Sequence, residues 1–104
     1  MLGKEDFAFT IGYDGERAVI DGKARREFGK LTTMELAEKG LYRAAFASAL
    51  WGLSQEHSKE QAEAEMRSFI DFFNRVAGTS YSRAEELQRL FGVTLESVSR
   101  TLVL

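Results

Sequence analysis

The sequence predicts an α+β fold in which an N-terminal antiparallel β-hairpin packs on a bundle of about four helices. Three observations predict it: an alternating apolar stretch beside an Asp-Gly pair, several helix-capping patterns, and apolar stripes with helical spacing. The chain has 104 residues, of which 44% are hydrophobic, so it has enough material for one core. We therefore expect a single domain over residues 1–104.

Residues 7–21 carry the hairpin pattern. In Phe7–Tyr13, large apolar side chains alternate with small or polar ones, and Asp14 and Gly15 follow directly before Glu16–Asp21. An Asp-Gly pair favours a two-residue turn, because both central positions of that turn need positive φ. The two flanking ranges are therefore predicted to be paired strands.

A turn at Asp14 and Gly15 also predicts the register of the hairpin. It places Ile11 opposite Ala18 and Phe9 opposite Ile20, on one apolar face that other elements must cover. The next stretch, Gly22–Lys30, is polar and contains two glycines, and we interpret it as a connector.

Capping and apolar patterns predict the helices that follow. Thr32 and Glu35 form a capping box, which predicts the start of the first of them. Leu41–Leu53 is apolar nearly all round, as is typical of a helix at the centre of a core. Ser58–Ala77 is the clearest helix, with Gly78 as its stop. Its predicted buried stripe consists of Ala62, Met66, Phe69, Ile70, Phe73 and Val76.

A further short helix is expected over Arg83–Phe91. Ser82 and Glu85 are its predicted caps, and Gly92 is its predicted end. Its predicted inward side chains are Leu87, Leu90 and Phe91. The stretch after Gly92 fits two structures: a helix capped by Thr94, or a strand that extends the hairpin to three strands.

Composition excludes several kinds of chemistry. The chain has no cysteine, and its one histidine, His57, lies in a polar stretch before a helix start. The glycine patterns that bind phosphates are absent, and so is the Gly-x-Ser-x-Gly pattern of serine hydrolases. We therefore expect no enzymatic activity and no cofactor or metal. The absence of a membrane-length apolar run and of a signal pattern predicts a cytoplasmic protein with no membrane contact.

One segment resembles a known family. Residues 86–102, ELQRLFGVTLESVSRTL, resemble the helix-turn-helix of the Crp/Fnr family of bacterial transcription regulators. The resemblance implies that Glu96 and Arg100 reach base edges of DNA, while Thr94 and Ser99 approach phosphates. These roles are chemically reasonable, because in the major groove a carboxylate can accept a hydrogen bond from cytosine and a guanidinium can donate hydrogen bonds to guanine.

A basic cluster supplies a further candidate contact to DNA. Its members are Lys23, Arg25, Arg26 and Lys30. Such a run is also common on solvated surfaces, and the net charge of the whole chain is −2.

The sequence thus predicts a small non-enzymatic binding module. Its most specific version is an accessory helix-turn-helix DNA-binding protein. The alternative is a protein–protein interaction or oligomerising domain that uses the hairpin edge and an exposed aromatic side chain at Phe72.

Overall fold

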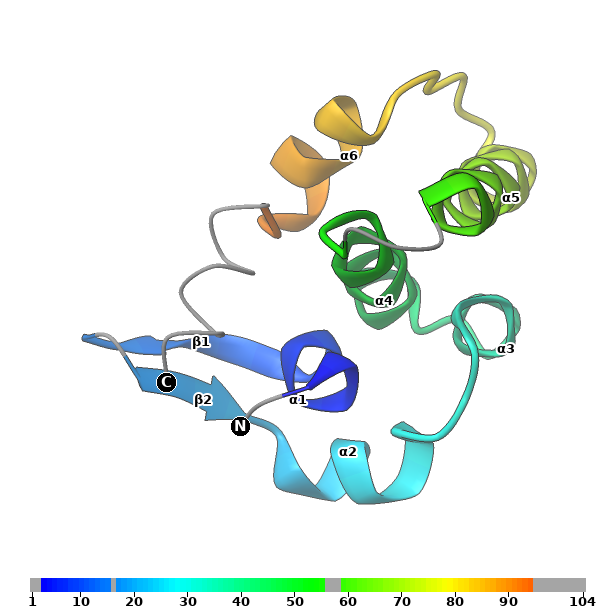
Figure 1. The fold of residues 1–104 in the computed structure, drawn as a ribbon. Helices are drawn as coiled ribbons and strands as arrows, with labels where there is room; N and C mark the ends of the chain where they lie inside the picture. Colours follow the sequence, from blue (N-terminus) through cyan, green and yellow to red (C-terminus); the bar gives the residue numbers. More distant parts are fainter. Residues whose placement is uncertain (1–2, 16, 56–58, 95–104) are drawn as a thin grey trace.

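The computed structural model describes residues 3–15, 17–55 and 59–94, and the predicted α+β class is confirmed (Figure 1). The described elements are, in chain order, α1 (Lys4–Ala8), β1 (Thr10–Asp14), β2 (Arg17–Ile20), α2 (Gly22–Phe28), α3 (Thr33–Glu38), α4 (Tyr42–Leu53), α5 (Lys59–Ala77) and α6 (Ala84–Phe91). The two strands form one antiparallel hairpin, and the helices gather beside it.

Helix α4 is the centre of the core, as its apolar sequence predicts. It packs against α1, α3, α5 and α6, which surround it in Figure 1. Ala45, Phe46 and Leu50 are completely buried. A helix with neighbours on nearly every side has to be apolar nearly all round, so the fold explains the composition of this segment.

Helix α5 covers one side of α4 with the expected stripe, except at its end. The stripe residues Ala62, Met66, Phe69, Ile70 and Phe73 are buried. Val76 was predicted to join them, and that prediction is wrong: its side chain is 54% exposed. It lies in the last turn of α5, before Gly78, whose φ of 69° ends the helix as expected.

The start of the first predicted strand is helical instead. Phe7 lies in α1, and Phe9 is the C-cap residue of that helix, so the strand begins only at Thr10. Both rings are buried, and the ring of Phe7 lies 5.5 Å from that of Trp51 in α4. Side chains two apart suit a strand pattern, but a helix followed directly by its cap also brings both rings to the core.

The register of the hairpin also differs from the prediction. Asp14 pairs with Arg17 and Tyr13 pairs with Ala18, while Ile20 pairs with Thr10 across a β-bulge. Strand pairing therefore continues through Asp14, and the turn lies one residue later than expected. The predicted positive φ at Gly15 is confirmed at 63°.

The stretch interpreted as a polar connector is a helix. The side chain of Asp21 accepts a hydrogen bond from the backbone N–H of Ala24 at 3.1 Å and so caps α2. Ala24 and Phe28 pack on the core. These two side chains, four residues apart, are enough to dock a short helix.

Two further caps can be compared with the sequence. The box between Thr32 and Glu35 is present at the start of α3. At α6 the expected partner is wrong, because Glu86 rather than Glu85 accepts hydrogen bonds from Ser82. Ser58, the predicted first residue of the helix that ends at Ala77, lies outside the described residues.

Candidate functional site

The end of α6 is the described part of the predicted helix-turn-helix. Leu87 anchors the helix and is completely buried. Gly92 takes the left-handed conformation with a φ of 68°, and its N–H donates to the carbonyl of Gln88 at 2.9 Å. Val93 is buried directly after it. The helix therefore ends in a tight turn pinned by one apolar side chain, which is the geometry that such a motif requires at its corner.

The packing of α6 differs from the prediction at one position. Leu90 was expected to face inward, but its side chain is 51% exposed. Phe91 is half-buried, and its ring lies 5.4 Å from the rings of both Phe46 and Phe73. Because neighbouring helical residues point about 100° apart, burial of Leu87 and Phe91, four residues apart, turns Leu90 outward.

The first turn of α6 is capped by a carboxylate. Oε1 of Glu86 accepts hydrogen bonds from the backbone N–H groups of Ser82 and Arg83 and from the Ser82 hydroxyl, each at 3.1 Å. The bonds from Ser82 lower the pKa of Glu86 below its ordinary value. These bonds satisfy N–H groups at the start of α6, so the serine–glutamate pair acts as a helix cap.

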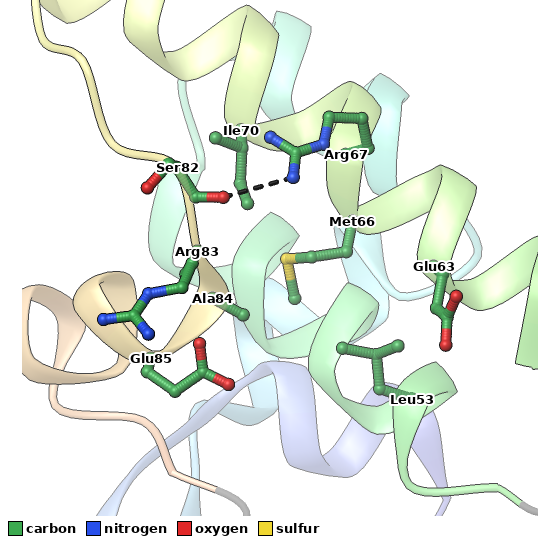
Figure 2. Close-up of a pocket in the computed structure, with 9 residues that line it drawn as sticks. All are labelled: Leu53, Glu63, Met66, Arg67, Ile70, Ser82, Arg83, Ala84 and Glu85. Atoms are coloured by element: carbon green, nitrogen blue, oxygen red, sulfur yellow. Dashed lines mark hydrogen bonds between the residues drawn. The ribbon is translucent and has the colours of Figure 1, made fainter.

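A groove of about 380 Å³ lies between α5 and the start of α6 (Figure 2). Met66 and Ile70 of α5 and Leu53 of α4 form its apolar lining. Arg67 crosses its upper end, where its guanidinium donates to the carbonyl of Ser82 at 3.1 Å. The charged residues on its walls are Glu63, Arg67, Arg83 and Glu85. The two positive and two negative side chains give the walls of this groove a formal net charge of zero.

Arg43 joins the hairpin to the end of α6. From α4, its Nη1 donates to the carbonyl of Thr10 at 2.7 Å, and its Nε donates to the carbonyl of Phe91 at 3.2 Å. These two bonds connect residues that are far apart in the sequence. A small cavity beside Arg43 is lined in part by Gly92 and Val93. The corner after α6 is therefore held against β1 by one guanidinium.

The predicted basic cluster is divided by the fold. Lys23 and Arg26 of α2 and the nearby Lys30 are exposed. Arg25 is half-buried instead, with its Nε 2.7 Å from a carboxylate oxygen of Asp6 in α1. This ion pair fixes α2 to α1, so Arg25 acts in the structure of the domain.

The basic cluster lies apart from α6, which is the described part of the helix-turn-helix segment. Figure 1 shows α2 and α6 on opposite sides of α4. Thr94 is partly exposed at the end of the described chain. The predicted base-contacting and phosphate-contacting residues Glu96, Ser99 and Arg100 lie outside the described residues.

Phe72 was predicted to be an exposed aromatic side chain, and the structure differs. Its ring is half-buried and packs on the core, with the guanidinium of Arg75 5.9 Å from the ring centre. The exposed apolar side chains of the hairpin are Ile11 and Val19, at 64% and 42% exposure. The predicted register placed Ile11 on the covered apolar face and Val19 on the opposite, wetter face. The exposure of Val19 agrees with that placement, whereas Ile11 is exposed because the register shifts at a bulge between Thr10 and Gly12.

Comparisons with known proteins identify no relative: no family model, no curated protein and no solved structure matches the chain. Within residues 3–15, 17–55 and 59–94, no three acidic, histidine or cysteine side chains are grouped so as to hold a metal ion. None of the helices in these ranges has the length and apolar character needed to cross a membrane.

Proposed function

We propose that the chain is a small non-enzymatic binding module that binds DNA through its C-terminal part, from α6 onward. One observation supports the proposal most strongly: α6 ends at left-handed Gly92 and is followed by buried Val93. A helix-turn-helix needs a first helix fixed to the core and a tight turn that redirects the chain, and the described half of the motif has both.

The contacts to DNA come from the second half of the motif. In this proposal Glu96 and Arg100 contact base edges, while Thr94 and Ser99 contact phosphates. The charges of α6 and its cap residue give little help, because Arg83 and Arg89 are balanced by Glu85 and Glu86. Affinity therefore depends on a few local contacts, and we expect binding to weaken steeply as salt is added.

Fluorescence anisotropy with a pool of random-sequence duplexes at low salt tests the proposal. Arg100→Ala should weaken binding to a preferred duplex by about 5- to 150-fold, which corresponds to the loss of one base contact of about 1–3 kcal/mol. Arg75→Ala is the matched control, because it removes the same charge from the polar face of α5. Absence of binding by the wild-type protein, or equal weakening by both variants, would refute the proposal.

A protein-interaction role is the second candidate, and the hairpin favours it. Ile11 and Val19 expose apolar side chains on the two strands of a sheet that has only two strands in the described residues. Neither Phe72 nor the groove between α5 and α6 offers comparable support, because one is half-buried and the other has balanced charges. The open edge of β2 and the charges beside it support one form of this role, self-association.

A further inference from the structure

Among residues 3–15, 17–55 and 59–94, no strand pairs with the outer edge of β2. In an antiparallel hairpin, alternate residues direct their N–H and C=O groups toward the neighbouring strand. Asp14 and Arg17 close the turn, and the N–H of Asp21 donates to the carbonyl of Phe9 at 2.8 Å. By this alternation, the N–H and C=O groups of Ala18 and Ile20 point away from β1. None of the backbone hydrogen bonds outside the hairpin reaches these two residues within the described ranges.

The corresponding edge of β1 is contacted by the body of the domain. The carbonyl of Thr10 points away from β2 in this register, and it accepts the hydrogen bond from Arg43 of α4. Figure 1 shows β1 on the side of the hairpin nearer to α4 and α6, with β2 beyond it. The edge open to a further strand is therefore that of β2.

The sequence of this edge is complementary to itself. Arg17 and Asp21 stand two residues before and two residues after Val19, and all three are exposed. If a second copy of β2 runs antiparallel to the first with Val19 opposite Val19, each Arg17 faces Asp21 of the other copy. The same alignment places Ala18 opposite Ile20, which are the residues whose backbone groups point outward.

We propose that two copies of this chain associate through β2, antiparallel and about a two-fold axis at Val19. The paired hairpins form a four-stranded sheet in the order β1, β2, β2 of the second copy and β1 of the second copy. Each Ala18 and the opposite Ile20 exchange their outward N–H and C=O groups, so the interface has four backbone hydrogen bonds. Such an interface uses one patch on both copies, as closed two-fold dimers do.

The charged neighbours of Arg17 and Asp21 are compatible with this pairing. Within one chain, Asp14 stands opposite Arg17 in the hairpin. A planar guanidinium has five N–H donors and can contact Asp14 and the Asp21 of the second copy together. One carboxylate oxygen of Asp21 caps α2, which leaves the other for Arg17. The short edge predicts a small contact and therefore a weak dimer that forms at high protein concentration.

Sedimentation equilibrium of the full-length protein, without DNA, tests the proposal over a range of concentrations. The wild-type protein should approach twice the mass of the chain. Val19→Asp should raise the dissociation constant at least about ten-fold, because it places two carboxylates opposite each other at the axis. Ile11→Asp is the matched control on β1 and should leave the constant within about two-fold, because it lies one strand away from the axis.

A mixing experiment tests the charge pairing itself. Arg17→Asp alone and Asp21→Arg alone should each be monomeric, because like charges then face each other twice. Mixed together, the two variants should form a heterodimer, because both facing pairs become opposite in charge. Circular dichroism checks that Asp21→Arg, which loses the cap of α2, remains folded. If it does not, the comparison of Val19→Asp with Ile11→Asp still decides.

Three results would overturn this proposal: a wild-type monomer at all concentrations, equal weakening by Val19→Asp and Ile11→Asp, or failure of two folded charge variants to associate when mixed. A monomer with Ala18 and Ile20 amides protected from hydrogen exchange would show that another segment of the chain covers the edge. The dimer does not depend on the proposed DNA binding. Because the sedimentation assay contains no DNA, a failure of the dimer proposal is distinguishable from a failure of the proposed DNA binding.

Discussion

Removing the ring of Phe69 is the sharpest test of how the core is built. This side chain is completely buried in α5, and its ring centre lies 6.0 Å from that of Phe46 and 5.9 Å from that of Phe73. Emptying a large site of this kind costs about 3–5 kcal/mol of unfolding free energy. For a domain of this size, a loss of that order lowers the melting temperature by about 12 °C or more.

Phe72→Ala provides the internal comparison. Phe72 lies on the same helix three residues later, but its ring is only half-buried. Urea unfolding followed by circular dichroism should therefore show less than half the loss found for Phe69→Ala. Equal losses in the two variants, or a loss of only a few tenths of a kcal/mol for Phe69→Ala, would refute the assignment of Phe69 to the core.

Three further predictions concern a cap, a turn and a bridge. Hydrogen bonds from the N–H and hydroxyl of Thr32 lower the pKa of Glu35, so the stability that this carboxylate contributes is complete above its unfolded pKa and is lost as the pH falls through its folded pKa. Thr32→Ala should cost about 1 kcal/mol near neutral pH and should make the acid limb of a stability–pH curve less steep without abolishing it, because the backbone N–H of residue 32 still donates to Glu35; an unchanged limb would contradict the role of the hydroxyl in the cap. Gly92→Val should destabilise by at least about 1–2 kcal/mol in urea unfolding, because a β-branched residue resists positive φ, while Gly92→Asn should cost less; equal costs would contradict the left-handed turn. Arg43→Ala should cost about 1–3 kcal/mol and should raise the hydrogen-exchange rates of amides near Thr10 and Phe91 together; a change at only one of them would show that the bridge does not couple the two segments.

Patterns local to one helix could be predicted from the sequence. The capping box at Thr32, the buried stripe of α5 and the stops at Gly78 and Gly92 all depend on residues within a few positions of one another. Each has a physical signature that survives without tertiary context, such as a side chain that satisfies an end N–H or a glycine at positive φ.

Features decided by tertiary contacts could not be predicted in the same way. The spacing of Phe7 and Phe9 suits a strand, and contact with α4 makes this segment a helix and its cap instead. The helix α2 has only Ala24 and Phe28 to pack on the core, too few to give a periodic pattern. The Arg43 bridge joins residues 10, 43 and 91, and no local signal relates these positions.

Some features of the candidate site could be predicted from the sequence and others could not. The corner at Gly92 and Val93 follows from its local pattern, while Leu90 faces outward because Leu87 and Phe91 occupy the inner face. The separation of the basic cluster from α6 depends on the whole fold. The sequence suggested that both could contact DNA, but α2 and α6 lie on opposite sides of α4. The roles of Glu96, Ser99 and Arg100 stay predictions.

The central claim is that the chain after Gly92 continues as a recognition helix that contacts DNA. Assigning the backbone carbon shifts of the full-length protein labelled with ¹³C and ¹⁵N, and then following its amide shifts by NMR as a random-sequence duplex is added at low salt, tests it most directly. We predict helical carbon shifts over residues 94–102 in the free protein, and amide changes on titration that are concentrated in that range and disappear at high salt. Extended-strand shifts over 94–102, or an unchanged spectrum at saturating duplex, would contradict the claim.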